Sequence, residues 1–221
     1  MMGVILRFEI LAQAVINTSE LMILALVNKY KLLLKMPKAK ATVNIENVVT
    51  TATLNQKIDL NAVVKGYPGV EYRPEQFPGL VFRLKRPKTA TLIFNSGKMV
   101  CTGAKSEKES RRAVMHVIKE LKKSGIIIIS KPELKTVNIV ASGSLGGMID
   151  LEKATYDLGR TMYEPEQFPG LIYRMDDPKV VILLFASGKL VCTGAKREED
   201  VYIAVNKLHQ RLEDQKLIYY E

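Results

Sequence analysis

The chain contains one 34-residue segment twice. Residues 72–105 and 163–196 align without a gap, 91 residues apart, and are identical at 22 of 34 positions. The correspondence extends beyond the segment, since Asn47 falls on Asn138 and Asp59 on Asp150. A duplication of this length constrains the fold strongly, because both copies must form the same supersecondary unit. Two copies are too few for an open repeat array, so we expect one pseudo-symmetric body.

Each copy predicts the same order of strands and helices. Stretches rich in Val, Ile and Thr indicate opening strands at residues 43–54 and 135–145. An aspartate suited to N-capping then begins a short helix, over residues 59–69 and 150–159. Three further strands follow, separated by RPK or DPK and by SGK turns. Each copy closes on a helix whose apolar residues recur at helical spacing: Val114, Val117, Ile118 and Leu121 in the first, and Val201, Ala204, Val205, Leu208 and Leu212 in the second.

The duplication also predicts the domain organisation. We expect an N-terminal extension over residues 1–37, a first repeat over 38–131 and a second repeat over 132–221. Charged residues break the apolar extension into pieces too short to cross a bilayer as one helix, so no membrane partner is expected. We interpret the extension as an appended helix or hairpin, or as the product of an upstream start codon, with Met36 as the alternative start.

Charge indicates the class of partner. The chain has 33 Lys and Arg against 23 Asp and Glu, which gives a formal charge of +10 and a pI near 9.5, and makes a polyanion such as nucleic acid a candidate. Residues 41–131 carry 16 Lys and Arg against 7 Asp and Glu, whereas residues 132–221 carry 11 against 14. The only two cysteines, Cys101 and Cys192, exclude a disulfide scaffold and predict small buried thiols in a reducing compartment.

Alternation along the strands predicts an open, largely apolar sheet face. Side chains of a strand point to opposite faces in turn, and each copy offers two helices, enough to cover one face only. The uncovered face would hold Leu92, Phe94, Val100, Thr102, Leu183, Phe185, Val191 and Thr193. Such a face is expected to meet a partner. The same face would hold Asn47, Asn138 and two phenylalanine pairs, Phe77 with Phe94 and Phe168 with Phe185, and around it would lie Arg83, Lys98, Lys105, Arg174, Lys189 and Lys196.

Signals for an enzyme are weak. The histidines, His116 and His209, lie within the closing helices, and we interpret them as structural because no Cys or carboxylate neighbours them at metal-ligand spacing. The glycine-rich stretches match neither a phosphate loop nor a dinucleotide fingerprint. The acidic pair Asp176–Asp177 and the run 198–200 are interpreted as a turn and a helix start, not as catalytic acids. We therefore expect no catalysis, no cofactor and no metal.

At these residues the chain resembles the TATA-binding protein family, most closely its archaeal members. Three motifs carry the resemblance and occur twice at fixed spacing: PEQFPGL at 74–80 and 165–171, F-x-SGK at 94–98 and 185–189, and CTGAK at 101–105 and 192–196. The resemblance covers about residues 42–214. It implies an α+β fold, a pseudo-twofold saddle of two repeats, in which a curved antiparallel ten-stranded sheet carries four helices on its convex face.

The resemblance also implies a function and a set of site residues. The chain would be a general transcription initiation factor that binds the TATA element of promoter DNA in the minor groove and bends it. Phe77, Phe94, Phe168 and Phe185 would wedge base steps, and Asn47, Asn138, Val49, Val140, Thr102 and Thr193 would lie at base edges. The six cations named above would contact phosphates. Transcription factor B would dock at Glu164, Glu166 and Gln167, with RNA polymerase recruited indirectly.

Two functions from other classes remain open alternatives. A protein-binding scaffold could use the same open sheet face to meet another protein. A glycosylase-like enzyme could use the aromatic residues to open DNA, but it lacks a placed catalytic Asp or Lys in a pocket. The expected location is the archaeal cytoplasm, associated with the nucleoid, or the nucleus if the source were eukaryotic.

Overall fold

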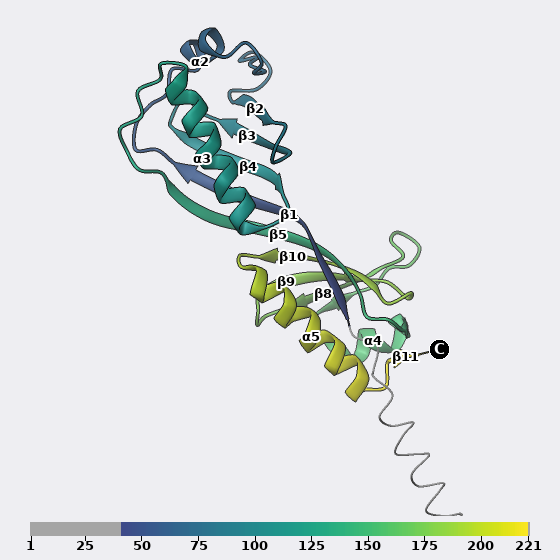
Figure 1. Cartoon of the computed structure of the whole chain (residues 1–221). Helices are drawn as coiled ribbons and strands as arrows, with labels where there is room; N and C mark the ends of the chain where they lie inside the picture. The colour runs from purple at the N-terminus through teal and green to yellow at the C-terminus, as the bar shows by residue number, and fades with distance from the viewer. Residues whose placement is uncertain (1–40, 221) are drawn as a thin grey trace, which may run out of the picture. The chain divides into compact units, whose positions relative to one another are not determined.

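The computed structural model describes residues 41–220 (Figure 1). The expectations for residues 1–37, including the start at Met36, lie outside the described residues. Within the described part of the chain, no helix is both long and apolar enough to cross a membrane.

The first half consists of a long strand, a short helix, three strands and a long helix. These are β1 (Thr42–Thr53), α2 (Leu60–Gly66), β2 (Leu80–Leu84), β3 (Thr89–Ile93), β4 (Lys98–Ala104) and α3 (Glu107–Lys123). The second half repeats this order with additions: β5 (Glu133–Ser144), β6 (Met148–Ile149), α4 (Leu151–Leu158), β7 (Thr161–Met162), β8 (Leu171–Met175), β9 (Val180–Leu184), β10 (Lys189–Ala195), α5 (Glu198–Asp214) and β11 (Ile218–Tyr219). The predicted order of elements is confirmed in both halves, and only the two-residue strands β6, β7 and β11 were missed. The expected boundary at residues 131 and 132 falls in the connection between α3 and β5.

The short helices begin where the aspartates predict. The Asp59 carboxylate accepts hydrogen bonds from the N–H groups of Asn61 (2.9 Å) and Ala62 (3.2 Å), and Asp150 accepts one from Lys153 N–H (3.1 Å). These are free N–H groups of a first helical turn, which have no partner within the helix. Both helices therefore start at fixed positions.

One antiparallel sheet contains most of the strands, in the order β2-β3-β4-β1-β5-β10-β9-β8-β7. The tenth strand of the expected sheet is reduced to a single bridge, Glu71 with Val81. That bridge corresponds, 91 residues earlier, to the pairing of Met162 with Ile172 between β7 and β8. The class of fold, with a large antiparallel sheet and four helices in residues 41–220, is confirmed.

The two halves meet at the pairing of β1 with β5. Val48 lies opposite Ile139, and Asn47 opposite Val140, just as Val49 lies opposite Asn138. Asn47, Val48 and Val49 correspond to Asn138, Ile139 and Val140 in the second repeat, so these three pairs join equivalent segments of the two repeats. The pseudo-twofold axis therefore passes through the middle of this ladder.

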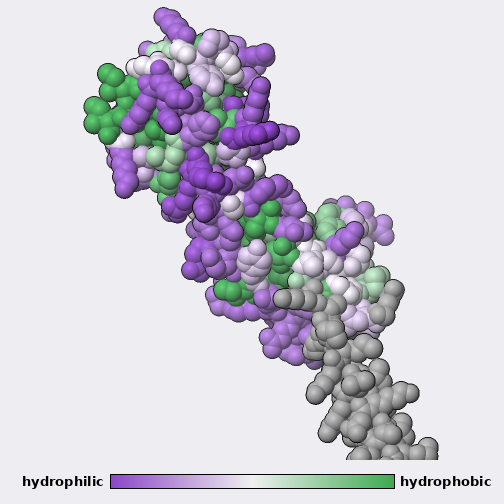
Figure 2. All heavy atoms as spheres, in the orientation of Figure 1, coloured by the Kyte–Doolittle hydropathy of each residue, from purple (hydrophilic) through white to green (hydrophobic). Residues whose placement is uncertain are grey.

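The helices cover one side of the sheet. In Figure 1, α3 lies across the strands of the first half and α5 across those of the second, and this side of the molecule is predominantly hydrophilic on its surface (Figure 2). Every apolar residue predicted for the helix stripes is buried, which confirms both stripes. The buried side chains form two clusters, one in each half, with Val48 and Ala104 joining the second. Cys101 and Cys192 are fully buried, as predicted, and burial raises the pKa of both thiols, that of Cys192 to about 12.

Candidate nucleic-acid interface

The face of the sheet away from the helices is open and largely apolar. Along β3, β4, β9 and β10 fully buried side chains alternate with half-buried ones. The half-buried set includes all eight residues predicted for the open face: Leu92, Phe94, Val100, Thr102, Leu183, Phe185, Val191 and Thr193. Val49 and Val140 are half-buried beside them, on β1 and β5. The predicted assignment of faces is therefore correct, while the DNA contacts of these residues stay a prediction.

Two asparagines occupy equivalent places at the middle of this face. The Oδ1 atom of Asn47 accepts hydrogen bonds from Gly103 N–H (2.7 Å) and from the Thr102 hydroxyl (3.1 Å). Asn138 Oδ1 likewise accepts from Gly194 N–H (2.8 Å) and the Thr193 hydroxyl (3.3 Å). A backbone N–H can only donate, so the atom it contacts must be the amide oxygen. The NH₂ group of each asparagine is left as the part that can donate to a ligand.

Glycine makes this arrangement possible. Gly103 and Gly194 have φ of +99° and +97°, a backbone conformation that favours glycine, and a Cβ at Gly103 would lie 2.9 Å from Lys88 O. These glycines belong to the repeated CTGAK motif. The motif therefore serves to orient the asparagine of the neighbouring strand.

An aromatic pair lies at each end of the sheet. Phe77 and Phe94 meet edge to face with ring centroids 5.9 Å apart, and Phe168 and Phe185 with centroids 5.8 Å apart. Phe77 is 41% exposed, which is unusual for phenylalanine, a residue that is most often buried. A hollow adjoins each pair, lined by Thr51, Phe94, Lys98 and Val100 at one end and by Ser142, Phe185, Lys189 and Val191 at the other.

The repeated PEQFPGL motif forms the loop that presents these rings. We call residues 73–79 and 164–170 the stirrup loops. Each begins with a turn in which one carbonyl, that of Arg73 or Glu164, accepts two N–H groups, including that of the phenylalanine. A Cβ at Gly79 would lie 2.6 Å from the Phe77 ring and 3.0 Å from the Phe94 ring, and Gly170 is equally close to its own pair. Only glycine lets the two rings approach each other here.

The predicted phosphate-contacting cations differ between the repeats in their partners. In the first repeat Arg83 Nε lies 3.0 Å from a Glu71 oxygen and Lys105 Nζ lies 2.6 Å from a Glu46 oxygen, with all four side chains substantially exposed. Hydrogen bonds from Lys105 and Arg83 lower the pKa of Glu46 and of Glu71, respectively. At the positions that correspond to Glu71 and Glu46 the second repeat has Met162 and Val137. These two carboxylates were not identified from the sequence, because each lies far along the chain from the cation that it pairs with.

The remaining predicted residues lie at the surface. Lys98, Lys189, Arg174 and Lys196 are exposed around the open face. Glu164, Glu166 and Gln167 are exposed on the second stirrup loop. Their contacts with phosphates and with a partner protein stay predictions.

The expectation that no carboxylate neighbours the histidines is wrong. Each has a carboxylate four residues on: His116 Nε2 lies 3.6 Å from Glu120, and His209 Nε2 lies 3.8 Å from Glu213 and 2.7 Å from the Tyr220 hydroxyl. A one-turn spacing brings such side chains together on a helix surface. Among residues 41–220, however, no three His, Cys, Asp or Glu side chains gather as a metal site would require.

Comparisons with known proteins agree with this geometry. A family profile described as transcription factor TFIID (or TATA-binding protein, TBP) matches residues 42–124 and 133–215. The chain is 57% identical over 173 residues to the TATA-box-binding protein of Sulfurisphaera tokodaii, covering 78% of this chain and 87% of that one. It is 52% identical over 176 residues to the TATA-box-binding protein of Methanothermobacter thermautotrophicus, covering 80% and 97%. Among solved structures it is similar to Methanococcus jannaschii TBP, with a TM-score of 0.71 and 50% identity over 78% of this chain and 98% of that one.

Proposed function

The chain belongs to the TATA-binding protein family, whose members are DNA-binding transcription factors and not enzymes, and we propose that it binds promoter TATA elements in the minor groove, bends them and recruits transcription factor B. Membership of this family removes the glycosylase-like alternative. The proposals that the chain binds the minor groove, bends the DNA and recruits transcription factor B are argued from the open sheet face and the stirrup loops.

The observation that carries the proposal is the orientation of Asn47 and Asn138. Their oxygens are occupied within the protein, so each presents hydrogen-bond donors at the centre of an apolar face. In the minor groove A·T pairs present only acceptors, whereas a G·C pair adds the donor of the guanine amino group. Two central donors amid apolar side chains therefore fit A·T pairs and leave a guanine amino group without an acceptor.

Bending is supported by the ring pairs at the two ends of the face. Kinking of DNA by apolar side chains inserted at base steps is the known behaviour of this family. Phe77 is exposed and braced by Phe94, and the second repeat has the same pair. A rigid pair at each end is suited to open two base steps.

Recruitment of transcription factor B is proposed at the second stirrup loop. Glu164 and Glu166 place two exposed carboxylates there, whereas the first stirrup loop has Arg73 and Glu75 at the same positions. Complementary charge raises the rate of association and fixes orientation. The difference between the stirrup loops would give a nearly symmetric protein a direction on DNA, and RNA polymerase would follow through transcription factor B.

A competition between duplexes tests the proposal. The purified protein is titrated against a TATA duplex, a G·C-substituted duplex, and a duplex in which I·C pairs replace T·A pairs, which keeps the minor-groove pattern and changes the major groove. We expect tight binding to the first and third duplexes and weak binding to the second. Loss of binding to the I·C duplex would contradict minor-groove readout. Equal, weak binding to all three would favour the protein-binding scaffold.

A further inference from the structure

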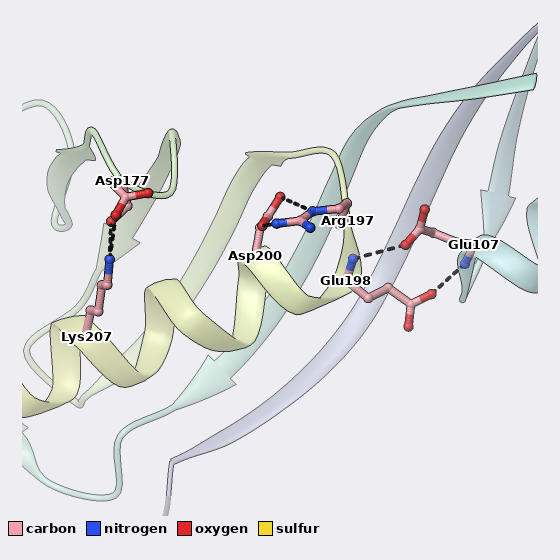
Figure 3. Close-up of polar contacts among 6 residues, drawn as sticks. All are labelled: Glu107, Asp177, Arg197, Glu198, Asp200 and Lys207. Atoms are coloured by element: carbon pink, nitrogen blue, oxygen red, sulfur yellow. Dashed lines mark hydrogen bonds and ion pairs between the residues drawn. The ribbon is translucent and has the colours of Figure 1, made fainter.

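The first residues of the two long helices exchange hydrogen bonds across the pseudo-twofold axis. Glu107 begins α3 and Glu198, its equivalent 91 residues on, begins α5. Glu107 N–H donates to Glu198 Oε1 (2.6 Å), and Glu198 N–H donates to Glu107 Oε2 (3.1 Å), as Figure 3 shows. Both residues are half-buried. Each carboxylate therefore satisfies a free N–H group of the other repeat's helix, at the positive end of that helix.

The two helices depend on this exchange to different degrees. At the start of α3, Ser106 Oγ accepts from Glu109 N–H (3.1 Å) and a Glu109 carboxylate oxygen accepts from Lys105 N–H (2.6 Å), so this helix start also has side-chain acceptors of its own repeat. The corresponding position before α5 is Arg197, which provides no side-chain cap and pairs with Asp200 instead (Figure 3). The start of α5 thus takes its side-chain acceptor from the first repeat.

Glu107 is also fixed from a third side. The hydroxyl of Thr136, on β5, donates to Glu107 Oε1 (3.1 Å). In the first repeat the position that corresponds to Thr136 is Ile45, so Glu198 has no such support. Glu107 therefore connects α3, α5 and the strand at the centre of the sheet.

Besides this exchange, Val48 and Ala104 of the first repeat pack in the core cluster of the second repeat on the helix side. The buried side chains divide into two clusters, and within residues 41–220 the hydrogen bonds found between α3 and α5 are the two of this exchange. On the sheet side the β1–β5 ladder is continuous, but its register shifts between Ile45 and Asn47 and again between Val49 and Thr50. Such bulges bend and twist a strand pair locally. The exchange on the helix side adds a further restraint to the angle that this bent ladder sets between the repeats.

We infer that Glu107 and Glu198 form a cross-repeat clasp that restrains the angle between the two repeats and, through it, the curvature that the open face imposes on DNA. They are positioning residues, since they lie on the face away from the proposed DNA site. The consequence for DNA rests on the proposed function, whereas the angle is a property of the free protein.

The first experiment uses the free protein. Cysteines placed at Lys65 on α2 and Tyr156 on α4, equivalent exposed positions in the two repeats, accept spin labels, while Cys101 and Cys192 are buried and unreactive. Electron spin resonance then gives the distribution of distances between repeats. We expect Glu107→Ala with Glu198→Ala to widen this distribution roughly 1.5-fold or more, because a restraint across a hinge is lost. An unchanged distribution overturns the clasp.

Two variants control for general destabilisation. Glu109→Ala removes the carboxylate that accepts from Lys105 N–H at the start of α3 and does not touch the second repeat, so it should lower the melting temperature but leave the distance distribution unchanged. Glu107→Gln with Glu198→Gln keeps an acceptor oxygen at each position and should restore the narrow distribution. Broadening in Glu109→Ala as large as in the double alanine variant would mean that the effect is loss of stability, and would also overturn the clasp.

The second experiment measures DNA. Fluorescence transfer between the ends of a saturated TATA duplex should report a smaller or more variable bend with the double alanine variant, and affinity should fall roughly 2- to 10-fold, as expected for one or two lost hydrogen bonds. A normal bend with a widened distribution would overturn the link from angle to DNA. If the wild-type protein neither binds nor bends the duplex, the proposed function fails, and the free-protein distances still decide the clasp.

Discussion

The Oδ1 atom of Asn47 lies 2.7 Å from the backbone N–H of Gly103, 56 residues away, and this contact decides which end of the asparagine a ligand can meet. Replacing Asn47 by Asp keeps that acceptor but puts a charged acceptor where the NH₂ donor was. We expect the fold to be retained and TATA affinity to fall by about 2 kcal/mol, roughly 30-fold, because base acceptors then face a carboxylate. Fluorescence anisotropy with a labelled duplex measures the loss. Unchanged affinity would remove Asn47 from the interface.

Gly79 tests the ring pair at the first stirrup loop. In Gly79→Ala the new methyl group would overlap the Phe77 ring, so the ring must leave its contact with Phe94. We expect a smaller bend of TATA DNA, with the melting temperature changed by less than about 4 °C, since Phe77 is largely outside the core. Gly69→Ala is the matched control, because its Cβ would meet nothing closer than 3.6 Å. A large loss of stability with a normal bend would show that the rings are structural.

The apolar core of the first repeat includes buried hydroxyl groups at positions where the second repeat has apolar side chains. Thr91 is fully buried, its hydroxyl has no nitrogen or oxygen partner in the described residues and lies beside the weakly polar thiol of Cys101, and its repeat-equivalent is Ile182. Thr91→Val should therefore stabilise the protein by about 1 kcal/mol, or roughly 2–4 °C in melting temperature. Thr50→Val should do the opposite, because Ser110 Oγ donates to Thr50 Oγ1 at 2.7 Å and would lose its acceptor. Thermal melts measure both effects. Melting temperatures that change in the same direction in the two variants would contradict this account.

The Glu46 carboxylate pairs with Lys105, one of the cations that we propose to contact phosphates. Glu46→Gln should raise DNA affinity roughly two-fold at low salt, and less as ionic strength rises, because exposed ion pairs are weak and screened. The hydrogen bond from Lys105 lowers the pKa of Glu46 below its usual 4.5, so the carboxylate is ionised at neutral pH and the gain should not vary between about pH 6 and pH 8. Glu152→Gln on α4 makes the same change of net charge elsewhere. An equal gain from this control would assign the effect to net charge alone.

The second stirrup loop tests partner recruitment. Glu164→Arg with Glu166→Arg should weaken the recruitment of transcription factor B to the DNA complex while binary DNA binding stays nearly intact, and the loss should shrink at higher salt. Glu75→Arg, at the equivalent of Glu166 in the first stirrup loop, is the matched control and should have little effect. A supershift titration at two salt concentrations measures recruitment. Wild-type recruitment at low salt would remove the second stirrup loop from the proposal.

The features of this protein that depend on local pattern can be predicted from its sequence alone. The spacing of 91 residues gave two equivalent units, and the alternation in TLIF and MVCT assigned Leu92, Phe94 and Val100 to the open face and Ile93 and Cys101 to the core. The capping positions Asp59 and Asp150 followed in the same way. Alternation and helical spacing are set by backbone geometry within a few residues, so they can be read from the chain.

The polar contacts that connect distant segments could not be predicted from the sequence, because they depend on how the strands and helices pack. The orientation of Asn47 by Gly103, the pairing of Glu46 with Lys105 and the exchange between Glu107 and Glu198 join residues 56, 59 and 91 positions apart. The ladders of β1 with β4 and with β5, and the packing of α3 and α5 on them, bring these groups together. A hydrogen bond requires its two groups to meet within about 3 Å at a suitable angle, and no local periodicity of the sequence records the register that achieves this.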